Sequence, residues 1–394
     1  MHTTEAWVLS EGPDGGAAHR ATLERTGYSF PEITPEEVLA EPIYGCWEAN
    51  MYHALARDPV DVCRQRGEPR VVVGNGGVVR VRRVGAAVTT CAPGDLCVVF
   101  PNAVADRHGY MVKAYAYDAP DTVGLLARTT KMPGSTLIPI PAGSRFSLRR
   151  WAAFSLRYIT AWANWRVAHA CWRSQLTEAD MAAPYVWAWG GGVALAELTL
   201  ARAHGAVTAM ASARPERLAR IAALGIEPID RRTFDGLHFD ASRYRCDRAY
   251  RDSYRDAEGR FLDLVRERTG GDGVSIFVDN IGGPVYRATL KAVGREGVVA
   301  TCGWRHGMEL TTIRATECIR RHIHAHTHYA RYQEGLAAVD YAERTGWLPP
   351  EPPVWAWEDV NDLAALYHAD QIHDYFALYR VNPEPGATSP EGQT

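Results

Sequence analysis

The segment 185–217 constrains the fold more than any other part of the chain. It opens with the apolar run Tyr-Val-Trp-Ala-Trp, which breaks at three consecutive glycines, residues 190–192. Apolar residues then recur at helical spacing as far as Ala201, and a second apolar run covers 206–211. This order of strand, glycine turn, helix and strand predicts the first unit of a dinucleotide-binding α/β fold, because glycines let backbone N–H groups approach a pyrophosphate. A tight turn without a ligand is the alternative.

The end of the second predicted strand indicates which dinucleotide would bind. An NAD site usually places Asp or Glu there, on the ribose 2′-hydroxyl. This chain has Ser212, Arg214 and Arg217 instead, and their hydroxyl and guanidinium groups suit a 2′-phosphate. We therefore expect NADPH; a solvated helix start is the alternative. The candidate cofactor-binding residues are Ala188, Gly190, Gly191, Gly192, Val193, Ser212, Arg214, Arg217, Asn280 and Cys302.

Composition excludes several classes of protein. The 394 residues are 46% hydrophobic and 23% charged, and the net charge is −3, so neither nucleic acid nor an anionic membrane is an expected partner. We find no run of 18 apolar residues and no signal-peptide core, and the eight cysteines are dispersed, which is typical of reduced thiols. We therefore expect a cytoplasmic protein of two domains.

The pattern along the chain divides it into four parts. Residues 1–150 carry short β-branched runs separated by Gly and Pro turns, which predict a small barrel or sandwich. Strand and helix patterns alternate over 151–345 and predict a parallel sheet with helices on both faces. Residues 346–381 are expected to return to the first domain, and 382–394 to form a disordered tail.

Four histidines alternate through residues 321–328, at 322, 324, 326 and 328. On a strand this spacing places all four on one face. Such a face can ligate a metal, remain a half-exposed polar surface, or supply one functional histidine. No carboxylate or cysteine stands among residues 321–328, which disfavours the metal.

A β-rich domain followed by a dinucleotide-binding domain resembles the medium-chain dehydrogenase/reductase superfamily. The glycine pattern of residues 74–95, Ala-Leu-Gly-Ile-Glu at 223–227 and Asp-Asn-Ile-Gly-Gly-Pro at 279–284 carry the resemblance. It implies an α/β protein with a GroES-like β-barrel domain and a Rossmann domain with a doubly wound parallel sheet. Zinc members of the superfamily have a Cys ligand, a Gly-His-Glu motif and a four-cysteine lobe. Cys46 can align with the first ligand, but residues 74–77 read Gly-Asn-Gly-Gly, and the cysteine spacing gives no lobe. The chain therefore resembles zinc-free members.

One branch, the crotonyl-CoA carboxylase/reductases, is more similar. Asn-Met-Tyr-His-Ala-Leu at 50–55 resembles its Asn-x-Trp-x-x-Leu, and Tyr-Ala-Tyr-Asp at 115–118 its Trp-Gly-Phe-Glu. Residues 187–194 resemble its tryptophan and glycine-rich motif, and Thr-His-Tyr-Ala-Arg-Tyr-Gln-Glu at 327–334 its Ser-His-Phe-Ala-Asn-Tyr-Arg-Glu. The resemblance implies a CO2 pocket formed by Asn50, Tyr117, Asp118 and His328, and a nicotinamide contact from Thr160. A helix cap is the alternative role for Asn50.

These motifs imply an NADPH-dependent reductase of α,β-unsaturated acyl thioesters, carried by CoA or a carrier protein, that transfers hydride without a metal. A homodimer or homotetramer is expected. Asp in place of Glu and Tyr in place of Phe favour simple reduction over reductive carboxylation. The alternatives are a crotonyl-CoA carboxylase/reductase proper, a quinone or enone oxidoreductase, and a nucleotide-binding partner protein without catalysis.

Overall fold

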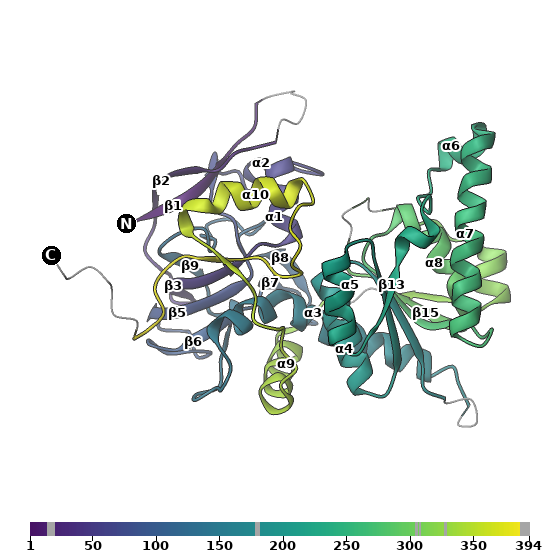
Figure 1. Cartoon of the computed structure of the whole chain (residues 1–394). Coiled ribbons are helices and arrows are strands. Elements are labelled where there is room, and N and C mark those ends of the chain that lie inside the picture. Colours follow the sequence, from purple (N-terminus) through teal and green to yellow (C-terminus); the bar gives the residue numbers. More distant parts are fainter. Residues whose placement is uncertain (14–19, 178–181, 304–305, 307–308, 327–328, 387–394) are drawn as a thin grey trace. The chain divides into compact units, whose positions relative to one another are not determined.

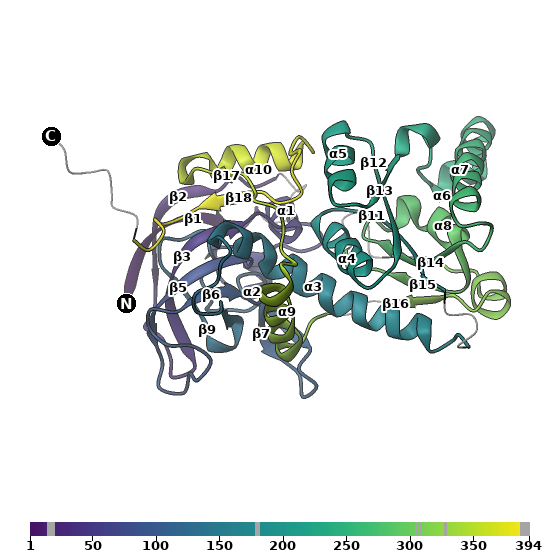
Figure 2. The same ribbon diagram turned by 60° about the horizontal axis from the view of Figure 1, so that its bottom comes forward.

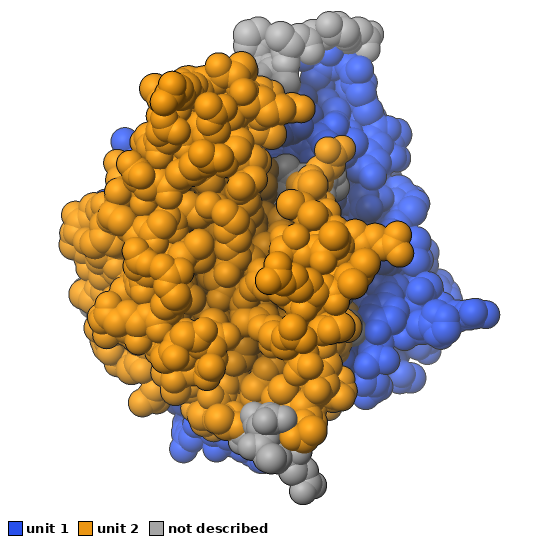
Figure 3. Space-filling view, turned by 90° about the vertical axis from the view of Figure 1, so that its right-hand side faces the viewer, with its two compact units in different colours: residues 1–159, 331–394 blue, residues 160–330 orange. Residues whose placement is uncertain are grey.

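The computed structural model describes residues 1–13, 20–177, 182–303, 306, 309–326 and 329–386 (Figure 1). The chain divides into two compact units, Met1–Ile159 with Arg331–Thr394, and Thr160–Ala330 (Figure 3). Our expected borders were residues 150 and 345. In the structure the first unit ends at Ile159, inside the long helix α3 (Leu148–Arg173). The chain returns to the first unit at Arg331, so α9 (Tyr332–Thr345) belongs to that unit. In the described part of the chain, no helix has the length and apolarity that a membrane span needs.

The second unit contains the parallel sheet that the alternating pattern predicts. Its strands are β11 (Tyr185–Trp189), β12 (Val207–Ser212), β13 (Glu227–Asp230), β14 (Val274–Asp279), β15 (Val293–Ala300) and β16 (His324–His326). All neighbouring pairs are parallel, in the order β13-β12-β11-β14-β15-β16. The chain proceeds outward from β11 in one direction and then from β14 in the other. A crevice for a ligand is expected at this reversal, beyond the carboxyl ends of β11 and β14.

Helices lie on both sides of this sheet. They are α4 (Gly192–Ala203), α5 (Pro215–Ala223), α6 (Ala241–Cys246), α7 (Arg248–Arg268) and α8 (Gly283–Ala292), with short helices η3 (Arg231–Phe234) and η4 (Arg314–Arg320). Figures 1 and 2 show α4 and α5 on one side and α7 and α8 on the other. On the α7 side, Phe261 packs between Trp187 and Trp189.

Helix α7 is longer than its sequence pattern predicts. The polar composition of 231–255 predicts a surface insertion there, and the apolar spacing predicts a helix only from Phe261. The helix instead begins at Arg248, because Tyr254, Ala257, Phe261 and Val265 recur at helical spacing and bury one narrow face. The abundant charges between them occupy the solvent side.

The first unit is built mainly from antiparallel strands. They are β1 (His2–Ser10), β2 (Glu24–Phe30), β3 (Glu37–Cys46), β4 (Arg70–Val71), β5 (Gly77–Val84), β6 (Leu96–Val99), β7 (Asn102–Ala105), β8 (Met111–Ala114), β9 (Thr130–Pro133), β10 (Leu137–Pro139), β17 (Val354–Trp355) and β18 (Leu378–Arg380). The largest sheet has the order β10-β6-β5-β3-β18-β17, and β9 also pairs with β3. Smaller sheets have the orders β2-β1-β4 and β7-β8.

The end of the chain completes the largest sheet of the first unit. β18 pairs antiparallel with β3, so a strand from beyond residue 375 lies beside one from the first fifty residues. Buried residues of α10 (Val360–His368) join the same core as Trp7 and Trp47. The remaining short helices are α1 (Ala49–Ala56), α2 (Val62–Arg66), η1 (Gly134–Thr136) and η5 (Trp357–Asp359).

Candidate functional site

The glycine turn stands at the carboxyl end of β11, next to β14. Gly190 has φ 142°, and a Cβ there would lie 3.1 Å from Asn280 Cβ and 3.3 Å from Ala194 Cβ. A larger residue is therefore strained and crowded at this position. At Gly191 a Cβ would meet no atom within 4 Å, and Gly192 begins α4. The turn thus presents open backbone and the free N–H groups of a helix start, where an anion is stabilised.

Asn280 lies against this turn and carries an unsatisfied donor. Its Oδ1 accepts from the Cys302 N–H at 3.1 Å and from Cys302 Sγ at 3.2 Å. A backbone N–H can only donate, so the amide oxygen faces Cys302 and the NH2 group faces away. Asn280 Nδ2 is buried without a partner among the described residues, and it lies 3.8 Å from where a Gly190 Cβ would be. A buried donor left without an acceptor is costly, and an oxygen of a bound nucleotide would satisfy it. The residues of this edge therefore fit a dinucleotide.

The residues predicted to select the cofactor lie at the end of β12. Ser212 is its last residue and is buried, and its Oγ accepts from the Arg214 N–H at 3.2 Å. Arg214 is the N-cap of α5, and both Arg214 and Arg217 are partly exposed. Parallel strands end at a common edge, so this group and the glycine turn lie at the same edge of the sheet. Val193 in the first turn of α4 is also partly exposed, whereas Ala188 is buried in β11.

Sequence reasoning missed a buried polar pair behind the glycine turn. Glu197, in α4, is fully buried, and its carboxyl accepts from Asn164 Nδ2 at 3.1 and 3.4 Å. Burial raises the pKa of Glu197 to about 8, against the opposing effect of the Asn164 hydrogen bond. Burial also raises the pKa of the Cys302 thiol, and the nearby Glu197 adds to that rise. The only signal in the sequence was a glutamate within an otherwise apolar helical run.

In the first unit, Asn50 belongs to a buried amide pair. It stands in the first turn of α1, and its Nδ2 donates to Asn75 Oδ1 at 2.9 Å. Its own Oδ1 is buried without a partner. The N-cap of α1 is Glu48, so the capping role that we considered for Asn50 is wrong. Asn75 is buried within the Gly-Asn-Gly-Gly segment, and sequence reasoning did not name it.

Glu48 forms a buried ion pair with Arg157 of α3. Arg157 Nε donates to Glu48 Oε2 at 2.8 Å, and the same guanidinium donates to the carbonyl oxygens of Trp47 and Tyr375. Burial raises the pKa of Glu48, and Arg157 opposes that rise. Within the described residues, Glu48 Oε1 has no nitrogen or oxygen partner, and the Cys46 thiol lies beside the carboxyl group and lowers its pKa. The pair fixes the residues that precede α1, and with them the backbone next to Asn50.

Of the predicted CO2-pocket residues, the three that the structure describes, Asn50, Tyr117 and Asp118, are not joined to one another by hydrogen bonds. Asp118 accepts from the backbone N–H of Ala114, within its own turn. Tyr117 is partly buried, and burial raises its pKa to about 12, with Asp118 and Asp58 adding to the rise. Thr160 is partly buried in α3. His328 lies outside the described residues.

Residues 321–326 are the described part of the histidine segment. Of these, 324–326 form β16, and His322 precedes that strand in a left-handed conformation with φ 55°. The side chains of His322 and His324 are exposed. Within the described ranges, no three His, Cys, Asp or Glu side chains gather in a way that could hold a metal ion.

Comparison with known proteins establishes the fold. No protein-family model matches the chain, and no curated protein matches its sequence. Among solved structures, the chain is similar to 2-octenoyl-CoA carboxylase reductase CinF from Streptomyces sp., in complex with NADP and 2-octenoyl-CoA, with a TM-score of 0.79, 20% identity, and coverage of 98% of this chain and 89% of that one.

Two further structures agree with this likeness. Crotonyl-CoA carboxylase/reductase AntE in complex with NADP has a TM-score of 0.77 and 19% identity, covering 96% of this chain and 94% of that chain. Alcohol dehydrogenase TADH from Thermus sp. ATN1 has a TM-score of 0.71 and 19% identity, covering 95% and 99%. The predicted likeness in fold to medium-chain dehydrogenases and to crotonyl-CoA carboxylase/reductases is confirmed.

Proposed function

We propose that this chain is an NADPH-dependent oxidoreductase that reduces the C=C bond of α,β-unsaturated acyl thioesters without a metal. The observation that carries the proposal is the open glycine turn at the reversal point of the parallel sheet, with the unsatisfied Asn280 amide against it. The likeness to structures solved with NADP, one of them also with 2-octenoyl-CoA, supports the choice of cofactor and substrate class.

We infer that the second unit is a doubly wound Rossmann domain and the first a GroES-like domain. The strand order β13-β12-β11-β14-β15-β16, with helices on both sides, supports the first assignment. The multi-stranded, mainly antiparallel sheet around β3 and β5 supports the second.

We assign a role to each group of residues at the carboxyl edge of the parallel sheet. The N–H groups at residues 190–192 and the start of α4 hold the pyrophosphate, and Arg214 and Arg217 bind the 2′-phosphate with Ser212. Asn280 donates its free N–H to an oxygen of the cofactor. When bound, the reduced nicotinamide would supply the hydride. In the first unit, the second N–H of Asn50 Nδ2, beside the one given to Asn75, and the amide N–H groups of Asn75 are the donors for the thioester oxygen, on which negative charge develops.

We propose simple reduction rather than reductive carboxylation. Asp118 is shorter than the glutamate of the carboxylating enzymes that it resembles, and its carboxylate is bonded to the Ala114 N–H. The Tyr117 hydroxyl, with its raised pKa, stays protonated at neutral pH and can hold a water or donate a proton. A carboxylating pocket must keep water away from the enolate, and both the shorter Asp118 and the Tyr117 hydroxyl leave room for water or hold it.

The proposal is tested by following NADPH oxidation with enoyl-CoA thioesters and with quinones, each with and without bicarbonate. We expect turnover of enoyl-CoA and a mostly uncarboxylated product in saturating bicarbonate. A mostly carboxylated product would reverse the choice of electrophile, and turnover of quinones alone would reassign the substrate class. Cofactor affinity is measured separately through tryptophan fluorescence. NADPH should bind at least about tenfold more tightly than NADH, since a charge-assisted pair contributes roughly 1.5–3 kcal/mol, and the Arg214→Gln variant should narrow that difference.

A further inference from the structure

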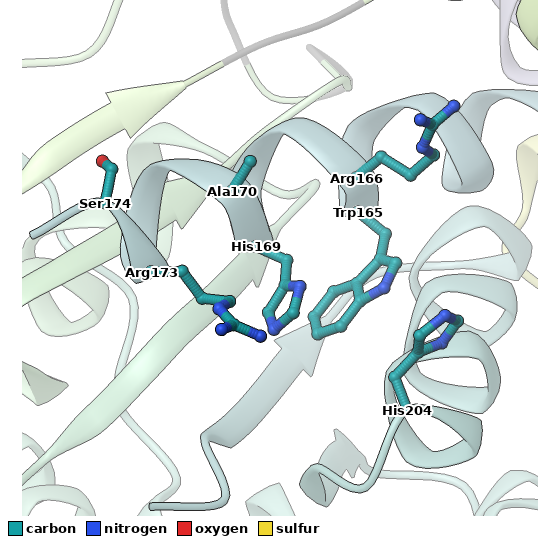
Figure 4. A pocket seen from close by; sticks show the side chains of 7 residues that line it. All are labelled: Trp165, Arg166, His169, Ala170, Arg173, Ser174 and His204. Atoms are coloured by element: carbon teal, nitrogen blue, oxygen red, sulfur yellow. The ribbon is translucent and has the colours of Figure 1, made fainter. Parts of the chain in front are cut away.

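A second group of chemically active side chains lines a groove in the second unit, away from the glycine turn. The groove has a volume of about 550 Å³ and lies along the second half of α3 (Figure 4). Its floor is formed by Trp165, and His204, the residue after α4, faces Trp165 from the neighbouring helix. A volume of this size is within the usual range for small-ligand sites.

The groove is lined by cationic and aromatic groups. Trp165, His169 and Arg173 are four residues apart and share one face of α3 (Figure 4). The His169 ring stacks on Trp165 with centroids 4.8 Å apart and 13° between the planes, which fixes the imidazole in place. Arg166 lines the groove on the flank of the helix. Among the described residues that line it, none is acidic.

The electrostatics of His169 reflect this crowding of positive groups. Burial lowers the pKa of His169, and Arg173 and His204 lower it further, because each disfavours a positive charge on the neighbouring imidazole. An anion in the groove would offset this repulsion and would favour the charged imidazole. Arg173 and the two imidazoles are also the donor types that suit phosphate oxygens.

The groove is separated from the candidate cofactor turn by the length of α4. That helix begins at Gly192 and ends at Ala203, a span of 12 residues, and at 1.5 Å per residue this is about 18 Å. His204 precedes the amino end of β12, whereas the glycine turn follows the carboxyl end of β11. One dinucleotide pyrophosphate therefore does not occupy both places.

We propose that this groove is a second anion site, which binds a small ligand carrying phosphate groups independently of the cofactor. Arg173 supplies the fixed charge, and His169 takes up a proton when the anion binds. Binding is therefore tighter at pH 6 than at pH 8 and weakens as salt is added.

The test is a calorimetric titration of the full chain, saturated with NADP+, with inorganic pyrophosphate at pH 6 and pH 8. We expect one additional binding event, with proton uptake seen as a difference between buffers of unlike ionisation enthalpy. Arg173→Gln should weaken it about tenfold, and His169→Gln should abolish the proton uptake. Arg248→Gln is the matched control, because this arginine on α7 has an 87% exposed side chain, and it should change nothing.

Equal affinities in Arg173→Gln and Arg248→Gln would overturn the proposal, as would loss of all pyrophosphate binding once NADP+ is present. Circular dichroism checks that each variant is folded, and His204→Gln replaces Arg173→Gln if that variant does not fold. If the chain fails to bind NADP+, the pyrophosphate affinities of Arg173→Gln and Arg248→Gln are compared without NADP+, and that comparison still tests the second anion site. Failure of the proposed cofactor function is thereby distinguished from failure of this second site.

Discussion

At the scale of single residues, the proposed contact with the cofactor depends on the small size of Gly190. With φ 142° and Asn280 Cβ 3.1 Å from the position of an added methyl group, alanine must displace either the turn or Asn280. We predict that Gly190→Ala weakens NADPH binding at least about tenfold and destabilises the fold by roughly 1–3 kcal/mol. Fluorescence titration and urea unfolding measure the two effects.

Gly259 offers the matched control for that substitution. It lies inside α7, and an added Cβ meets no atom within 4 Å. Gly259→Ala should leave NADPH affinity unchanged and raise stability by roughly 0.5–1 kcal/mol, since alanine favours a helix interior. Similar affinities in Gly190→Ala and Gly259→Ala would show that the turn does not contact the cofactor.

Glu197 should make the stability of the second unit depend on pH. Its pKa is about 8 in the folded chain and near 4.3 for an unperturbed carboxyl. Between these values the folded state holds a proton that the unfolded state has released, so the free energy of unfolding falls as pH rises, by up to about 1.4 kcal/mol per pH unit. We predict that Glu197→Gln removes this decline. The substitution should leave the free energy of unfolding nearly unchanged at pH 5 and raise it by a few kcal/mol at pH 8.

Urea unfolding at pH 5, 6, 7 and 8 checks this prediction. Glu267→Gln is the control, because the Glu267 side chain is 71% exposed. Its free energy of unfolding should equal that of the parent chain at every pH. Parallel pH profiles for Glu197→Gln and the parent would mean that Glu197 is already ionised in the folded chain.

Sequence reasoning identified residues with a local signature and missed those defined by burial. The glycines after an apolar run and the polar residues after the second strand could be read directly. Glu197, Glu48 and Asn75 could not, because each matters through a partner 25 to 109 residues away in sequence. Whether such a group is buried or solvated is decided by the assembled fold.

At the scale of elements, α3 is held within the first unit by Arg157. Its guanidinium ties the helix to Glu48, to the Trp47 carbonyl and to the Tyr375 carbonyl near the end of the chain. We predict that Arg157→Met destabilises the chain by about 3–5 kcal/mol, because it leaves the Glu48 carboxylate buried and unpaired. The double variant Glu48→Gln with Arg157→Met should recover part of that loss.

Thermal and urea unfolding of both variants measure this effect. Arg149→Met, on the same helix, is the control, since its ion pair with Glu351 is long at 3.8 Å and partly exposed, and it should cost less than about 1 kcal/mol. If Arg157→Met and Arg149→Met lowered the free energy of unfolding equally, the buried ion pair would contribute no more stability than a surface ion pair.

Element type was easier to predict than element length. The sequence pattern over 147–180, rich in Ala, Trp and Arg, predicts a long helix, and α3 occupies Leu148–Arg173. The apolar runs of the second unit form strands of its parallel sheet. The start of α7 was missed because its buried residues recur only every three to four positions and are separated by many arginines and aspartates. The histidine alternation begins at His322, whereas in the described residues the strand β16 begins at His324 and pairs with β15 alone.

At the scale of the whole molecule, the two-part organisation followed from the change of pattern along the chain. The placement of the last segment did not, because the pairing of β18 with β3 joins residues more than 330 positions apart. Periodicity reports only which residues face a core, and leaves open which distant strand completes a sheet. The same limit applies to the predicted CO2 pocket, whose members were matched by motif and make separate hydrogen bonds in the described residues.

The final prediction concerns zinc, because the residues that align with the zinc ligands of medium-chain dehydrogenases do not suit that metal. Cys46, the one residue that aligns with a zinc ligand, is fully buried, and burial raises its pKa well above the usual range, so the thiolate that zinc requires is disfavoured. Glu48 beside it is committed to Arg157, and residues 74–77 offer no imidazole or carboxylate. We predict well under one zinc per chain by elemental analysis, and NADPH oxidation that a chelator leaves unchanged. About one zinc per chain, together with activity lost to the chelator and restored by added zinc, would contradict the metal-free mechanism and require ligands from outside this set.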